Sequence, residues 1–145
     1  MWQILLLSLV LFNANPTVAD SIEIFDTDKE RIVSTIDNSE AFQKMAGALM
    51  ESVTGSVADL SPPLEKSLIV KIPLNPEQSF KQQKLQIDTT IRELFVVMPK
   101  QNKRRPWLIL HTKEDDTLLL EFTMDTAPLK ELINKEWQIQ SPSLQ

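Results

Sequence analysis

The sequence contains one histidine, His111, and histidine is the side chain best suited to moving protons at neutral pH. A hydrolase built on it would need a serine and a carboxylate from elsewhere in the chain. No G-x-S-x-G motif is present to mark such a serine. We therefore expect the protein not to be an enzyme, and we keep a small secreted hydrolase that uses His111 as an alternative.

The chain has few of the residues that usually bind metal ions. There is no cysteine, which excludes disulfides, thiolate ligands and cysteine nucleophiles. Zinc sites draw on several His, Cys or carboxylate ligands, and one histidine is a poor start. The acidic residues at 26–30 resemble the start of a calcium loop, but Arg31 and Asp37 stand where that loop needs glycine and glutamate. We expect no metal and no cofactor.

The best candidate for binding is a basic turn. Between Pro99 and Pro106 the sequence carries four cations, and these are Lys100, Lys103, Arg104 and Arg105. Arginine pairs match the geometry of phosphate and carboxylate groups. The sequence therefore predicts a binding surface for an anionic envelope polymer, an anionic lipid surface or an acidic patch on a partner protein.

The composition narrows the class of protein. Hydrophobic residues make up 42% of the chain, which is in the range of ordinary globular domains. The formal net charge of −5 argues against a nucleic-acid-binding protein, which needs a basic footprint. With only two glycines the chain also lacks the glycine-rich loops that cradle phosphates.

The first nineteen residues carry no charged side chain and resemble a secretory signal. An apolar core at 4–12 is followed by the breakers Asn13, Asn15 and Pro16, and Thr17 and Ala19 are small residues before a cleavage site. We expect cleavage before Asp20 and a location outside the cell or in its envelope. The alternative is a retained anchor, although nine apolar residues span only about 14 Å of a ~30 Å hydrocarbon layer.

The elements that must position these residues are one clear helix and several strands. Residues 39–54 place Phe42, Met45, Leu49 and Val53 at helical spacing, with Gly55 as the terminating residue. Apolar runs at 68–72, 87–98, 107–112 and 117–124 predict strands, the last two joined by an acidic turn at 113–116. We expect Glu121 to face a lysine such as Lys71 across the sheet.

The remaining segments carry weaker patterns. Residues 20–37 form an N-terminal lead-in: the alternating segment 21–25 fits a short strand or a loose segment, and the β-branched segment 31–36 fits a strand or the first turns of a helix. The polar stretch 75–86 is expected to be a long loop that either holds a short strand or forms a mobile flap. A short helix follows Asp125 or Thr126, and residues 138–145 form a flexible tail.

Together these elements predict an α+β fold: an antiparallel sheet of about four strands, one long N-terminal helix on one face, and a short C-terminal helix. The order of elements resembles the cystatin-like or PepSY-like layout. No motif accompanies the resemblance, so it assigns no residue. We expect a signal peptide at 1–19 and a single α+β domain at 38–137.

The function that follows is that of an exported, non-enzymatic binding domain acting through the basic turn. Besides the hydrolase, a second alternative is a regulatory or inhibitory domain that docks a peptide along a strand edge. We expect no nucleic-acid partner and no transmembrane span after signal cleavage.

Overall fold

The computed structural model of the chain describes residues 21–59, 61–101 and 104–140. The predicted signal peptide at 1–19, residues 141–145 of the predicted tail, and Lys103 of the basic turn lie outside the described residues.

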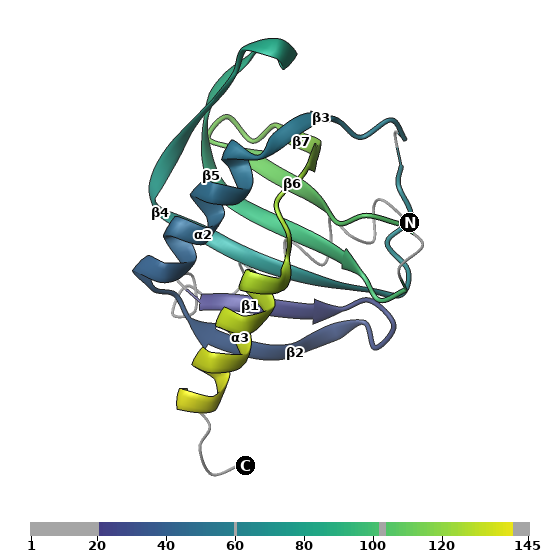
Figure 1. Cartoon of the computed structure of the whole chain (residues 1–145), viewed down its shortest axis with the longest axis vertical. Coiled ribbons are helices and arrows are strands. Elements are labelled where there is room, and N and C mark those ends of the chain that lie inside the picture. Colours follow the sequence, from purple (N-terminus) through teal and green to yellow (C-terminus); the bar gives the residue numbers. More distant parts are fainter. Residues whose placement is uncertain (1–20, 60, 102–103, 141–145) are drawn as a thin grey trace.

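The described chain is built mainly of strands. In order, it forms β1 (Ser21–Asp26), β2 (Arg31–Asp37), α2 (Glu40–Glu51), β3 (Val53–Ser56), β4 (Ser67–Gln82), a short 3-10 helix η2 (Gln83–Leu85), β5 (Ile87–Pro99), β6 (Trp107–Thr112), β7 (Thr117–Phe122) and α3 (Ala127–Gln140). These strands join in one antiparallel sheet of seven, in the order β2-β1-β4-β5-β6-β7-β3 (Figure 1).

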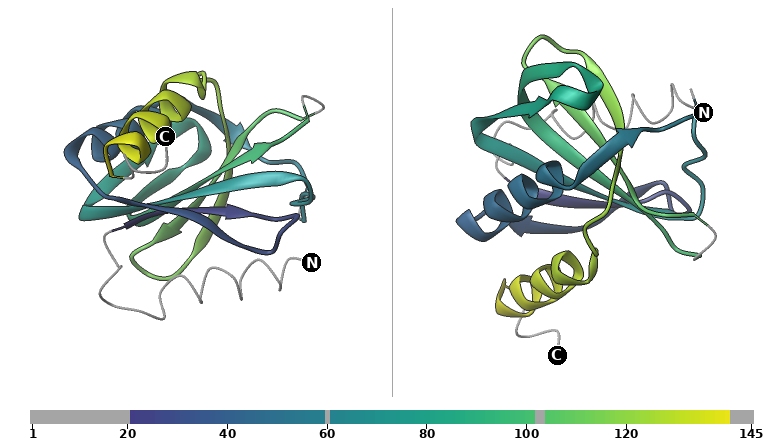
Figure 2. Two further views of the ribbon diagram at one scale, coloured as in Figure 1. Left: turned by 90° about the horizontal axis from the view of Figure 1, so that it is seen from below. Right: turned by 45° about the horizontal axis from the view of Figure 1, so that its top comes forward.

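Both helices lie on the same face of this sheet (Figure 2). α2 buries Phe42, Ala46 and Leu49 completely, which confirms the predicted apolar stripe. Leu129 of α3 is buried in the same cluster, beside inward-facing residues of the central strands. This layer is the main core, because it removes one whole face of the sheet from water.

The opposite face of the sheet carries a second, smaller apolar cluster. It contains Leu64, Ile69, Phe95, Val97, Trp107 and Ile109. Since β4, β5 and β6 bury residues on both faces, these strands have continuous apolar runs rather than alternation. That agrees with the interior strand predicted at 94–98.

The predicted fold of about four strands with one long N-terminal helix is wrong, because the structure is mostly sheet with two short helices. The helix ends at Glu51, and Val53, which fits the helical spacing, begins the edge strand β3. β3 has only four residues, too few for a periodic pattern. Segments 21–25 and 31–36 form β1 and β2, where the sequence had left a loose segment open for the first and the start of a helix open for the second.

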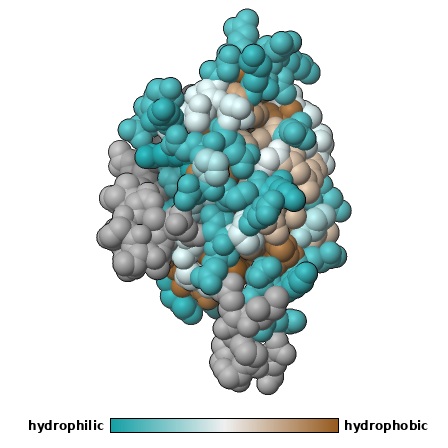
Figure 3. Space-filling view, turned by 90° about the vertical axis from the view of Figure 1, so that its left-hand side faces the viewer, coloured by the Kyte–Doolittle hydropathy of each residue, from teal (hydrophilic) through white to brown (hydrophobic). Residues whose placement is uncertain are grey.

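The polar stretch 75–86 belongs to a long hairpin, not to a loop. β4 passes through Pro73 and Pro76, and its register with β5 is interrupted between Pro73 and Gln78 before pairing resumes. Burial alternates along 78–82, but Phe80 is the one apolar residue there, so the sequence itself shows almost no hydrophobic alternation. Figure 3 shows that the projecting end of the molecule is hydrophilic.

The buried position of the β1–β2 hairpin gives a direct test of this fold. Ile36 of β2 is fully buried, whereas its neighbour Thr35 is exposed. We expect Ile36→Ala to lower the free energy of unfolding by about 2–5 kcal/mol because it opens a cavity in the main core. Thr35→Ala is the control and should stay within about 0.5 kcal/mol of the unmodified protein in urea denaturation. Equal, small effects would show that 21–37 is a loose lead-in.

Candidate functional site

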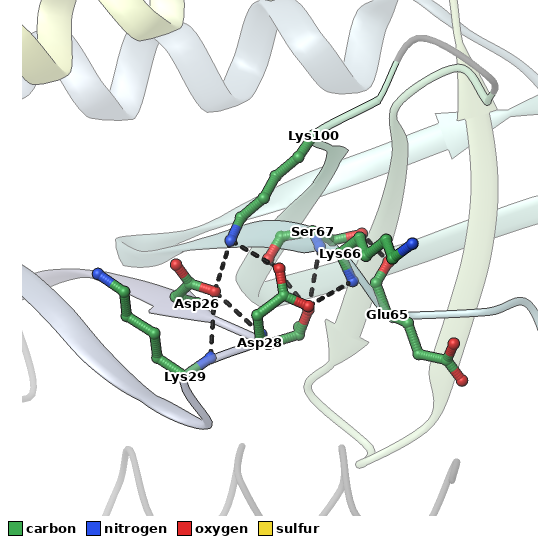
Figure 4. A network of polar contacts seen from close by, with 8 residues as sticks. Asp26, Asp28, Lys29, Glu65, Lys66, Ser67 and Lys100 are labelled. Carbon is green, nitrogen blue, oxygen red and sulfur yellow. Dashed lines mark hydrogen bonds and ion pairs between the residues drawn. The ribbon is translucent and has the colours of Figure 1, made fainter.

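The basic turn between β5 and β6 begins with a lysine that is already engaged. The ammonium of Lys100 lies 2.8 Å from Asp26 Oδ1 and 2.9 Å from Asp28 Oδ2, in the turn that follows β1 (Figure 4). The hydrogen bond from Lys100 holds the pKa of Asp26 below its usual value, and the two carboxylates raise the pKa of Lys100. Lys100 therefore ties two turns together and contributes little free charge.

The two arginines of the turn differ in their surroundings. Arg104 donates to Asp59 Oδ2 at 3.3 Å, and its guanidinium carbon lies 6.0 Å from the ring centroid of Trp107. Arg105 is exposed, and no contact to an acidic side chain is found for it among the described residues. Of the three predicted cations that the structure describes, Arg105 is thus the one without a carboxylate partner.

A cavity opens where this turn enters β6. Its volume is about 330 Å³, and its lining comes from the turn, β3, β6 and β7: Thr54, Val57, Arg104, Arg105, Pro106, Trp107, Glu121 and Phe122. Trp107 and Glu121 are opposite each other in the ladder between β6 and β7. The cavity therefore combines two guanidinium groups and a hydroxyl with one carboxylate and an apolar floor.

Trp107, one of the lining residues, carries an unused hydrogen-bond donor. The side chain is 2% exposed, and its indole Nε1 is buried without an acceptor in the described structure. A buried N–H group that lacks an acceptor costs about 1–3 kcal/mol. Because Trp107 also lines the cavity, a ligand that brings an acceptor to Nε1 would recover that cost.

A row of ionisable side chains crosses the face of the sheet that the helices do not cover. Lys71 of β4 is 1% exposed and lies 3.4 Å from Glu23 Oε1 on β1 and 3.8 Å from Glu93 Oε2 on β5. Glu93 Oε1 is 3.2 Å from Nδ1 of His111 on β6. Four ionisable side chains on four neighbouring strands thus form one continuous row, Glu23–Lys71–Glu93–His111.

The two glutamates of this row are tuned in opposite directions. Burial raises the pKa of Glu23 by more than the charge and hydrogen bond of Lys71 lower it. Burial also acts on Glu93, but the hydrogen bond with His111 and the charge of Lys71 outweigh it, so the pKa of Glu93 is lowered. The fold therefore favours the ionised form of Glu93 and disfavours that of Glu23.

The row has two elements of acid–base catalysis but lacks a nucleophile. His111 is oriented by Glu93 and packs edge-on against Phe95 with ring centroids 5.1 Å apart. Within the described residues, no serine or threonine hydroxyl is hydrogen-bonded to the His111 ring. The same residues contain no group of three or more His, Asp or Glu side chains arranged to hold a metal ion. Nor do they include a helix of the length and apolar character needed to cross a membrane.

Sequence reasoning found the arginines and His111 but missed the residues that define their surroundings. Glu121 was expected to face a lysine such as Lys71, and this expectation is wrong. β5 and β6 separate the two strands, and Glu121 stands opposite Trp107. Trp107 looked like an apolar strand residue, and nothing in the sequence marks its indole N–H as unpaired. Glu23 and Glu93 had one signal, a charged residue next to apolar residues of a strand.

No protein-family model, curated protein or solved structure matches this chain. The assignment of a function therefore depends on the geometry of its own side chains.

The charged row predicts a specific stability effect for Lys71. Replacing Lys71 with methionine leaves Glu23 and Glu93 buried without this counter-charge, and we expect the free energy of unfolding to fall by about 3–5 kcal/mol. The triple variant Glu23→Gln, Lys71→Met, Glu93→Gln removes the charges together and should recover most of the loss. Urea denaturation at pH 7 measures both. A Lys71→Met variant as stable as the unmodified protein would contradict the role of Lys71.

The link between Glu93 and His111 predicts a change in titration. In His111→Ala the largest remaining influence on Glu93 is burial, so the pKa of Glu93 should rise. In His111→Gln a hydrogen-bond donor is kept, so the pKa of Glu93 should stay low.

The same link makes stability depend on pH. Since the folded-state pKa of Glu93 lies below its ordinary 4.5, ionised Glu93 stabilises the fold above pH 4.5, and this stabilisation is lost as the pH falls. NMR titration of the Glu93 carboxyl carbon checks the shift, and denaturation should show the alanine variant losing most stability above pH 4.5.

Proposed function

We propose that the protein is an exported, non-enzymatic domain that binds a single anionic group, a carboxylate or phosphate of an envelope polymer or of an acidic partner protein, in the cavity beside Trp107. The observation that carries this proposal is the buried indole N–H of Trp107, which lacks an acceptor at a cavity also lined by Arg104 and Arg105.

The chemistry of the cavity favours a planar or tetrahedral oxyanion. Guanidinium groups present several N–H donors in a fixed fork that matches carboxylate and phosphate oxygens. The indole of Trp107 can donate but cannot accept a hydrogen bond, so a group rich in acceptors is what it requires. Thr54 adds a hydroxyl that can donate as well.

The charge balance around the turn limits the size of the group that is recognised. Lys100 is compensated by Asp26 and Asp28, and Arg104 is partly compensated by Asp59. Glu121 adds a negative charge to the cavity lining. A broad polyanion-binding face would keep its cations free, so these contacts favour recognition of one oxyanion, with Arg105 supplying most of the attraction.

The same balance separates the proposed ligand from a nucleic acid. Binding to a phosphate backbone by counterion release needs many free cations, whereas this chain has a net charge of −5 and pairs Lys100 and Arg104 within itself. We expect affinity for the anionic group to fall only mildly with salt, as one or two charge contacts would give. The signal-like segment at 1–19 supports an encounter outside the cytoplasm.

Retention on immobilised poly-glutamate and on polyphosphate tests the proposal. We expect Arg105→Glu to weaken retention at least tenfold, because it replaces the attracting charge with a repelling one. Trp107→Phe keeps the ring and removes only the N–H; loss of one hydrogen bond to a charged group should weaken retention by about tenfold. The polymer that retains the protein more strongly identifies carboxylate or phosphate as the ligand.

Lys84→Glu is the matched control, because Lys84 is an exposed cation of η2, outside the lining of the cavity, and its reversal changes the net charge equally. Its retention should stay close to that of the unmodified protein. Equal weakening by Lys84→Glu and Arg105→Glu would mean that only the net charge matters, and unchanged retention of Arg105→Glu would end the proposal.

A further inference from the structure

We infer that two copies of this chain join edge to edge through β2, so that their sheets continue into one another. Three features of β2 and its neighbour α3 favour this interface: an open strand edge, a buried serine hydroxyl without a partner, and a helix that extends past the edge.

The first feature is the difference between the two edges of the sheet. β3 has four residues, its register with β7 shifts near Thr54, and Gln82 Nε2 donates to the carbonyl of Val53 at 3.0 Å. β2 has seven residues and pairs with β1 on one side only. β2 is therefore the edge of the described sheet that offers a longer row of backbone donors and acceptors to another strand.

The charges of β2 favour a second copy as that strand. Arg31 and Asp37 are exposed and stand at its two ends. Antiparallel pairing of β2 with the β2 of another copy brings the Arg31 end of each strand beside the Asp37 end of the other. A bulge at Val33 twists this edge and limits the new ladder to the residues around Ser34.

The second feature is Ser34 at the middle of β2. Its Oγ is buried without a hydrogen-bond partner in the described structure, and its ladder partner Ile24 belongs to the core on the helix-covered face. If the two-fold axis passes through Ser34, the same serine of the other copy becomes its direct neighbour, on the same face of the continuous sheet. The two hydroxyls then bond to each other, and the cost of each buried group is removed.

The third feature is the position of α3. Its last turns extend past β2 in Figure 1, while its contacts with β2 hold the helix over the edge. The apolar stripe of α3 starts with Leu129, which is fully buried, and reaches Trp137, which is 37% exposed. A second sheet joined at β2 would give the end of this stripe a surface to cover, and the two α3 helices would meet above the axis.

The chemistry of α3 is compatible with contact between like copies. Between Leu129 and Trp137 its charged residues are Lys130, Glu131, Lys135 and Glu136, two of each sign. Two copies with a net charge of −5 each repel at long range, so an interface between them has to be locally neutral. Both β2 and this part of α3 satisfy that condition.

Cysteine cross-linking of the full chain tests the axis. Because the natural sequence has no cysteine, Ser34→Cys introduces one thiol, and the proposed pairing sets the two thiol-bearing Cα atoms about 4.5–5.5 Å apart, within disulfide range. Mild oxidation at micromolar concentration should convert most of the protein to a cross-linked dimer. Thr35→Cys is the control, because each Thr35 is one residue from the axis and the pair is separated by about 7 Å along the strands alone.

Sedimentation tests the contribution of α3. We expect Trp137→Glu to raise the dissociation constant of the dimer at least tenfold, whereas Gln138→Glu, an equal charge change at the neighbouring exposed position, should leave it nearly unchanged. A protein that stays monomeric at all concentrations, with no cross-link through Ser34→Cys, overturns the inference and leaves the edge to an unrelated extended peptide. A dimer that cross-links equally through Thr35→Cys overturns the proposed register.

Discussion

One buried lysine constrains the arrangement of the whole sheet. Lys71 lies between Glu23 and Glu93 on the strands either side of it. Because side chains alternate between faces, a slip of β4 by one residue would carry this ammonium into the apolar core beneath the helices. A charge there would lack both carboxylates and would cost several kcal/mol. This penalty favours the observed register of β1, β4 and β5 over a slip by one residue.

Sequence patterns located the parts of the fold whose apolar residues recur at a regular period. The helix with Phe42 and Leu49 and the strands with Val96 and Ile109 were found because burial sets their spacing. β3 was missed because four residues carry no period, and the far half of β4 was missed because backbone pairing, not an apolar pattern, marks it as a strand. The count of strands was too low because β3 was missed and because the sequence left the structure of β1 and β2 open.

The candidate site shows the same division between composition and geometry. The sequence indicated a cluster of cations, but the structure compensates Lys100 through two aspartates that stand far from it along the chain. It also leaves the indole of Trp107 without an acceptor, although tryptophan in a strand usually signals packing alone. The cavity is therefore distinguished by the unpaired indole N–H of Trp107 and by Arg105, the cation without a carboxylate partner. Residue types alone do not reveal that a donor is unpaired or that a cation is uncompensated.

The positions of the first strands also bear on how the chain folds. Among the described strands, β1 pairs with β4, and β3 pairs only with β7, which is the last strand along the chain. Segments from the first part of the chain thus wait for partners that are made much later, and such non-local pairing folds slowly. The ladder from β2 to β6 can form before β7 is available, but β3 can join the sheet only after it. Until then the free edge of β6 stays open to any machinery that escorts incompletely folded polypeptides.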